Sequence, residues 1–139
     1  MRKSIGVFLL ALAIGACNND STSPPTGTLS GSYLLRSANG VSVPGIASQD
    51  ATGLYEVLHG RIVLRSDFSF VDTLQDRFTP TGGAAQPGID VRVGTYVQTG
   101  NNIALTFQKG NSVAYYSLTW IDPNTLAYSE LGLSLIYAK

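Results

Sequence analysis

Short turn signals recur along most of this sequence and divide it into runs of β-forming residues. The runs are rich in Val, Ile, Tyr, Phe, Thr and Leu, and none offers a helical stripe of useful length. The residues between them tolerate positive φ, preset φ or bond to their own backbone, and they stand at Asn39-Gly40, His59-Gly60, Ser66-Asp67, Thr99-Gly100-Asn101, Lys109-Gly110-Asn111 and Asp122-Pro123-Asn124. The sequence therefore predicts an all-β domain.

The runs between these turns predict eight or nine antiparallel strands. They lie near residues 31–39, 53–58, 61–66, 68–78, 89–98, 102–108, 112–121, 125–130 and 133–138. Two longer segments, 43–52 and 79–88, contain Pro and Gly at several positions and are predicted to be mobile loops.

One of these strands alternates strictly between apolar and polar residues. Ile89, Val91 and Val93 share one face, whereas Asp90 and Arg92 share the other. Because an antiparallel strand of this kind usually turns its apolar face to the core, we expect the three apolar residues to be buried. Short connections favour a meander, which removes its exposed edges only by closing. We predict an up-and-down barrel, closed or partly closed, with a two-sheet β-sandwich as the alternative.

Residues 1–16 have a different composition from the rest. Arg2 and Lys3 precede an uncharged apolar run over residues 5–14, and two small residues follow it. This order of basic, apolar and small residues is typical of a secretory signal peptide. The run is too short for a transmembrane helix, which needs about 20 apolar residues.

The end of this segment, Ile14-Gly15-Ala16-Cys17, resembles the lipobox of bacterial lipoproteins. The resemblance implies removal of residues 1–16 and attachment of a diacylglyceryl group to Cys17, usually with a further acyl chain on the new amino terminus. Two or more chains hold a protein stably on a membrane. Asn18 stands where an Asp favours inner-membrane retention, so the resemblance implies the periplasmic face of the outer membrane or the cell surface. A plain cleaved signal with a chance cysteine is the alternative; Cys17 is the only Cys, which excludes an intrachain disulfide.

The rest of the chain divides into a tether and one domain. Residues 17–28 contain no large apolar side chain and are predicted to be a disordered tether that follows the lipidated Cys. Residues 29–139, about 110 residues, have the usual size of a single domain. The seven basic and nine acidic residues after Cys17 leave a formal net charge of −2, which argues against a nucleic-acid partner.

The start of the domain, Gly31-Ser32-Tyr33, resembles the opening Gly-x-Trp signature of lipocalins and lipocalin-like lipoproteins, with Tyr33 in place of Trp. The resemblance implies a small barrel whose aromatic ring packs across the barrel floor.

Residue types that carry catalysis or bind metals are scarce. His59 is the only His, and the chain has no Gly-x-Ser-x-Gly elbow for a nucleophile. A zinc site needs several His or Cys ligands. Asp67, Asp72 and Asp76 lack the spacing of an EF-hand loop. We therefore predict no enzyme activity, no cofactor and no metal.

Asp72 is the acidic residue with the most informative position. In the strand predicted over 68–78 it shares a face with Phe68, Phe70 and Leu74. A buried carboxylate must find a partner or raise its pKa, and in either state it can orient a ligand. The alternatives are that a bulge turns Asp72 to water or that an Arg neutralises it.

A second face, formed by Tyr116, Leu118 and Trp120, fits a core, a ligand wall or a partner surface. The sequence thus predicts a monomeric, membrane-anchored lipoprotein whose barrel binds a small apolar ligand. The residues proposed for that site are Phe68, Phe70, Asp72, Tyr116 and Trp120. The alternative is a protein-interaction or inhibitor module of the cell envelope with a filled barrel and loop 79–88 as its binding segment.

Replacement of Cys17 by Ser tests the anchor. Because Cys17 carries the only thiol that lipid can modify, metabolic labelling with a fatty-acid analogue should disappear in the Cys17→Ser protein. Equal labelling of both proteins would contradict the lipobox interpretation.

Overall fold

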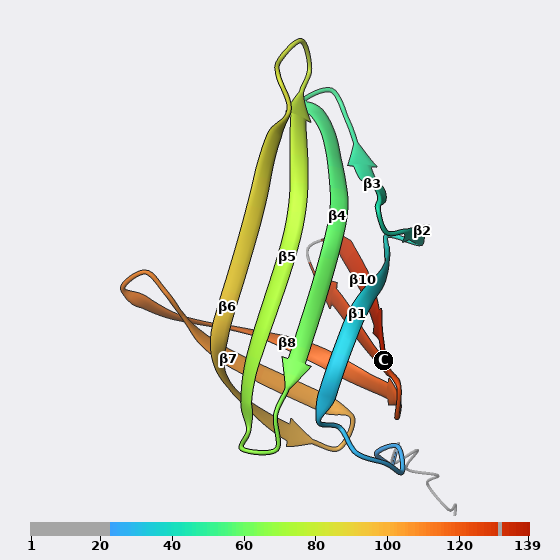
Figure 1. The fold of residues 1–139 in the computed structure, drawn as a ribbon, viewed down its shortest axis with the longest axis vertical. Coiled ribbons are helices and arrows are strands. Elements are labelled where there is room, and N and C mark those ends of the chain that lie inside the picture. The colour runs from blue at the N-terminus through green and yellow to red at the C-terminus, as the bar shows by residue number, and fades with distance from the viewer. Residues whose placement is uncertain (1–22, 131) are drawn as a thin grey trace, which may run out of the picture.

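The structure, a computed structural model, describes residues 23–130 and 132–139 as one antiparallel sheet of ten strands (Figure 1). No helix occurs among these residues. The strands are β1 (Gly31–Ala38), β2 (Val41–Ser42), β3 (Gly45–Gln49), β4 (Gly53–Leu64), β5 (Ser69–Pro80), β6 (Gln86–Thr99), β7 (Asn102–Lys109), β8 (Ser112–Asp122), β9 (Thr125–Glu130) and β10 (Leu133–Ala138).

Eight strands close into a barrel, which confirms the predicted fold class. The order around the barrel is β1-β10-β9-β8-β7-β6-β5-β4, and β1 then pairs with β4. The closing register joins Gly31 to Leu64 and Leu34 to Arg61. β2 and β3 lie outside this ring, where β2 pairs with β1 and β3 with the first half of β4.

The prediction of a turn at His59-Gly60 was wrong, because β4 runs without interruption through both residues. The ladder to β5 contains only a register shift between Val57 and His59. An ideal Cβ on Gly60 would lie 2.8 Å from the Leu35 side chain. Gly60 therefore serves the close approach of β1 inside the barrel, which is a common reason for Gly within a strand.

The two predicted loops are also largely strand. The segment 43–52 contains β3, and the segment 79–88 is shortened to a turn over 81–85 because β5 extends to Pro80 and β6 begins at Gln86. β3 is a short edge strand whose register with β4 shifts between Ile46 and Ser48. Such a bulge interrupts the alternation of inward and outward side chains, so the sequence pattern does not indicate a strand.

The barrel interior is packed with large apolar and aromatic side chains. The side chains that are less than a tenth exposed include Tyr33, Leu35, Val57, Ile62, Leu64, Phe70, Leu74, Tyr96, Ile103, Leu105, Tyr116, Leu118, Trp120, Leu126, Leu135 and Tyr137. Tyr33 closes the end at which the domain begins. Its hydroxyl donates to the Leu29 carbonyl oxygen at 2.6 Å, and the Lys139 ammonium lies 4.9 Å from its ring centroid. Burial, together with nearby Tyr96 and Asp122, raises the pKa of Tyr33 to about 12.

The upper halves of β4, β5 and β6 rise beyond the other barrel strands, as Figure 1 shows, and β3 lies along their edge. We call this part the extension; it comprises β3, residues 53–59 of β4, 75–80 of β5 and 86–93 of β6. The prediction that Ile89, Val91 and Val93 are buried was wrong, because their side chains are 57–70% exposed on the outer face. Asp90 and Arg92 face the other way, toward the barrel mouth.

The extension and the start of the domain lie at opposite ends of the molecule (Figure 1). Gly31 pairs with Leu64, just before the β4–β5 turn at the lower end, while the β5–β6 turn is the upper tip. A chain attached to the membrane through the residues before Leu29 would therefore carry the extension on its far side.

A chain that begins at Thr28 should fold on its own, because every strand that the structure describes lies beyond this residue and the Thr28 carbonyl already accepts a 2.7 Å hydrogen bond from the Lys139 ammonium. We expect a β-type circular dichroism spectrum and a cooperative thermal transition. A helical spectrum, or the absence of a transition, would contradict this prediction.

Candidate functional site

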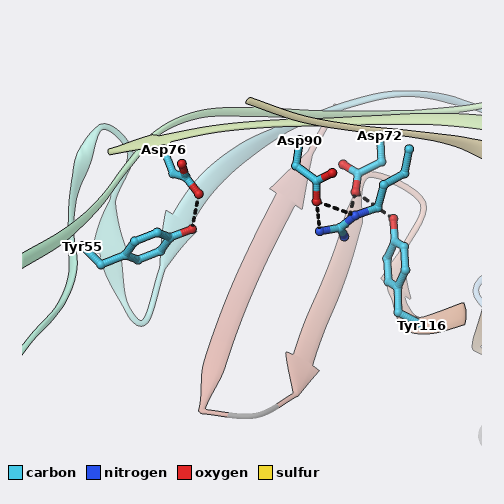
Figure 2. Close-up of polar contacts among 6 residues, drawn as sticks. Tyr55, Asp72, Asp76, Asp90 and Tyr116 are labelled. Atoms are coloured by element: carbon cyan, nitrogen blue, oxygen red, sulfur yellow. Dashed lines mark hydrogen bonds and ion pairs between the residues drawn. The ribbon is translucent and has the colours of Figure 1, made fainter. Parts of the chain in front are cut away.

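The most polar part of the barrel interior is its mouth, where β5 and β6 leave the closed ring. Figure 2 shows Asp72 from β5, Asp90 from β6 and Tyr116 from β8 close together, with Asp76 and Tyr55 forming a separate contact beside them. Inward positions of a strand recur every second residue, so Asp72 and Asp76 both point inward from β5. Asp90 and Arg92 point inward from the neighbouring strand β6, where Arg92 pairs with Asp72.

Asp72 is the one buried charged residue among those described, at 3% exposure. The Tyr116 hydroxyl donates to its Oδ2 at 2.9 Å, and Arg92 Nη1 lies 3.4 Å from the same oxygen. Burial is the main influence on this carboxyl and raises its pKa above the ordinary value, although Tyr116 and Arg92 oppose the shift. Burial of the ring, together with the Asp72 carboxylate, raises the pKa of Tyr116, so this phenol remains a proton donor.

Arg92 joins the two acidic groups at the mouth. Its Nε donates to Asp90 Oδ2 at 2.8 Å and its Nη2 also bonds that oxygen, while Nη1 reaches Asp72. The guanidinium carbon lies 5.2 Å from the ring centroid of Tyr116 and 5.6 Å from that of Phe107, within the range of a cation–π contact. One cation is thus held by two carboxylates and two rings.

Beside this network lies a cavity of about 40 Å³. It is lined by Asp72, Leu74, Arg92, Tyr116, Leu118, Tyr128, Leu133, Leu135 and Tyr137. Asp72 Oδ1 has no hydrogen-bond partner among the described residues. A buried polar cavity of this size is large enough for one or two water molecules, which would satisfy that oxygen.

A second polar contact lies further along the extension. The Tyr55 hydroxyl donates to Asp76 Oδ2 at 2.7 Å. Gly88 lies directly beneath the Asp76 carboxylate, so that a Cβ at this position would collide with it. The inner face of the extension therefore carries a hydrogen bond between β4 and β5.

The residues predicted for a ligand site separate into three groups. Asp72 and Tyr116 meet at the cavity, and the Phe70 ring packs edge-to-face on Tyr116 with centroids 6.4 Å apart. Trp120 is buried further along β8 and does not line the cavity. The prediction that Phe68 shares the inner face was wrong: it lies in the β4–β5 turn with φ of +63° and a side chain that is 60% exposed.

Sequence reasoning named an Arg as a partner for Asp72 but did not identify Arg92. The alternation of Asp90 and Arg92 with three apolar residues contains the signal, but the apolar face of this strand is the outer one and the charged face is the inner one. An open cleft of about 280 Å³ lies between β6 and the tip of the β7–β8 hairpin. It is lined by Asp90, Val91, Arg92, Phe107, Gln108, Lys109 and Gly110.

Comparison of the chain with protein-family models, with curated proteins and with solved structures found no match. Within residues 23–130 and 132–139, no group of three His, Cys, Asp or Glu side chains is placed to hold a metal ion. No helix in the described part of the chain has the length and apolar character to cross a membrane.

Substitution of Asp72 by Asn should change how stability depends on pH. Because the folded-state pKa of Asp72 is raised, the bound proton stabilises the fold fully below the unfolded-state pKa of about 3.9, and this contribution is lost as the pH rises through the folded-state pKa. The free energy of unfolding of the native protein, minus that of Asp72→Asn, should therefore fall as the pH rises above about 4, by at most about 1.4 kcal/mol per pH unit.

Urea unfolding of both proteins between pH 4 and pH 8 measures this difference. The carboxyls of Asp50, Glu56, Asp67 and Asp122, whose pKa values are lowered by hydrogen bonds, are common to both proteins and cancel. A difference that is constant across the range would show that Asp72 titrates as it does in the unfolded chain.

Proposed function

We propose that this protein is a lipid-anchored lipoprotein of the bacterial cell envelope that binds another envelope protein through the outer side of its extension. It performs no chemistry itself. The observation that carries the proposal is the exposed row of Ile89, Val91 and Val93 on a barrel whose interior is filled.

The interior volume supports a protein partner over a small apolar ligand. Sites for small molecules usually enclose about 300–1,000 Å³, whereas the cavity beside Asp72 has about 40 Å³. Its walls also include the charged groups of Asp72 and Arg92. An apolar guest would have to displace Tyr116 or the leucines around it.

The outer surface of the extension supports the same proposal. Isolated apolar residues on a surface are normal, but a contiguous row is typical of an interaction site. Val93 pairs across the sheet with Val71, and Val71 pairs with Val63, so the apolar row continues from β6 over β5 to β4. Tyr115, 82% exposed on β8, adds an aromatic ring to the outer surface of the hairpin beside the cleft.

The position of the anchor agrees with this use. The tether leaves from the end with Tyr33 and Leu29, and β4 and β5, each 12 residues long, span about 40 Å toward the other end. The apolar row would therefore lie away from the membrane to which Cys17 attaches the chain, where it can reach a partner in the envelope.

Photo-crosslinking in the native cell tests the proposal. A photoreactive amino acid in place of Val91 should form one discrete crosslinked product with an envelope protein. The matched control places the same amino acid at Thr119, which is exposed on the outer face of β8 away from the extension, and should give no product.

Two results would contradict a protein-interaction function. One is equal crosslinking from both positions. The other is the absence of product from Val91 together with a shift of Trp120 fluorescence on titration with an apolar probe, because a ligand inside the barrel would then be the better explanation.

A further inference from the structure

The upper part of β6 is an unpaired sheet edge. β5 pairs with β6 from Gln86 to Thr95, but β7 pairs with β6 only from Gly94 to Thr99. Residues 86–93 therefore have a neighbouring strand on one side only. Gly94 marks the point of separation, because a Cβ there would collide with the Thr106 carbonyl oxygen of β7.

The hydrogen-bond pattern shows which main-chain groups point to this edge. Tyr96 N–H donates to the Phe68 carbonyl at 2.8 Å, so Tyr96 directs its main-chain groups toward β5. In an antiparallel pair such residues alternate with residues that point the other way. The N–H and C=O groups of Ile89, Val91 and Val93 therefore point to the open side.

The same three residues thus present both unpaired main-chain groups and exposed side chains. Pro87 lies two residues before Ile89 and therefore has the same orientation. Its backbone nitrogen, which carries no hydrogen, points to the open side, so the proline costs no hydrogen bond to β5. Strand edges of this kind bind extended peptides by β-augmentation, in which main-chain bonds supply affinity and alternate side chains supply specificity.

A symmetric pairing of two copies centred on Val91 does not fit the edge. In a symmetric antiparallel pairing centred on Val91, Pro87 of the copy would lie opposite Thr95, where Thr106 of β7 already pairs. The copy could not bend away, because its own β6 is held along its whole upper part by β5. A linear segment can leave the sheet at that point.

We propose that residues Ile89–Val93 bind an extended segment of the partner as an added β-strand, and that this segment carries β-branched residues at alternate positions and a carboxylate facing the cleft. The carboxylate is expected because Lys109 lines the cleft and takes part in no ion pair among the described side chains. This inference rests on the proposed function and specifies how the partner is held.

Amide exchange measured by NMR on the full chain, purified from membranes in detergent micelles, tests the proposal. The probe is an eight-residue peptide of alternating valine and threonine with one central glutamate. Without peptide, the amides of Ile89, Val91 and Val93 should exchange faster than those of Asp90 and Arg92. With peptide, the first three should become protected.

Three controls separate main-chain pairing from simple apolar contact, and a fourth, at Lys109, tests the carboxylate. The same peptide with alternate amides N-methylated keeps its side chains but cannot pair, and it should not protect the edge. Val91→Pro removes one donor on the open side and should weaken peptide binding about fivefold, since one hydrogen bond contributes roughly 1 kcal/mol. Val91→Thr retains the donor and should bind within about threefold of the native protein. Lys109→Ala should weaken binding of the glutamate peptide but not of a glutamine version.

The proposal is overturned if the N-methylated peptide binds as well as the parent, if Val91→Pro binds normally while its spectrum shows an intact fold, or if none of the peptides binds. It is also overturned if the protein forms a dimer that Val91→Pro dissolves, since a second copy would then occupy the edge. Crosslinking from the Val91 position in cells, if it persists in any of these cases, leaves the proposed function standing and rejects only the strand-addition mode.

Discussion

The pairing of β1 with β4 is the interaction on which the rest of the structure depends. It joins the first barrel strand to a strand about 30 positions later and thereby removes two edges that an open sheet would expose. β4 is longer than β1, so the closing ladder uses only residues 61–64 of β4 and leaves its first half for another partner. The extension is thus a consequence of closing a barrel with strands of unequal length. β3 pairs with the first half of β4 on one side. On the other side β5 pairs with β4, and β6 pairs with β5.

The strands that keep one environment along their whole length were predictable from sequence. β7, β8, β9 and β10 have Gly or Asn turns and a consistent inner face, and their predicted bounds agree with the structure to within one residue. β4 and β6 were harder because each crosses from the closed barrel into the extension. Alternation gives the two faces of a strand but not which one is covered, and the apolar face of β6 is the outer one in its upper half. Gly60 was ambiguous for a different reason, since close packing and a turn both favour Gly.

Asp72, Phe70 and Tyr116 were named from the sequence as residues of the candidate site, whereas Arg92 and Asp90 were not. The pairing of Asp72 with an Arg corresponds to one of the alternatives considered from sequence, and the approach of Tyr116 depends on two segments 44 residues apart that only the barrel register brings together. The network of Asp72, Arg92 and Asp90 fixes the inner face of β5 and β6 where β7 no longer supports β6. Buried charge is a weak source of stability, but it can specify one arrangement among several. Here it orients the strand whose other edge is open.

The two edges of the extension are not equivalent, and this limits what can grow from it. β3 is five residues long, its ladder is bulged, and the Ala47 carbonyl already accepts a hydrogen bond from the Asn39 side chain. Growth of a sheet into a fibre requires two regular edges on each unit, one to receive a strand and one to offer the next. A protein with a single regular edge cannot continue such growth. Once that edge is occupied, no second edge is left to bind another strand, and assembly stops at a one-to-one complex.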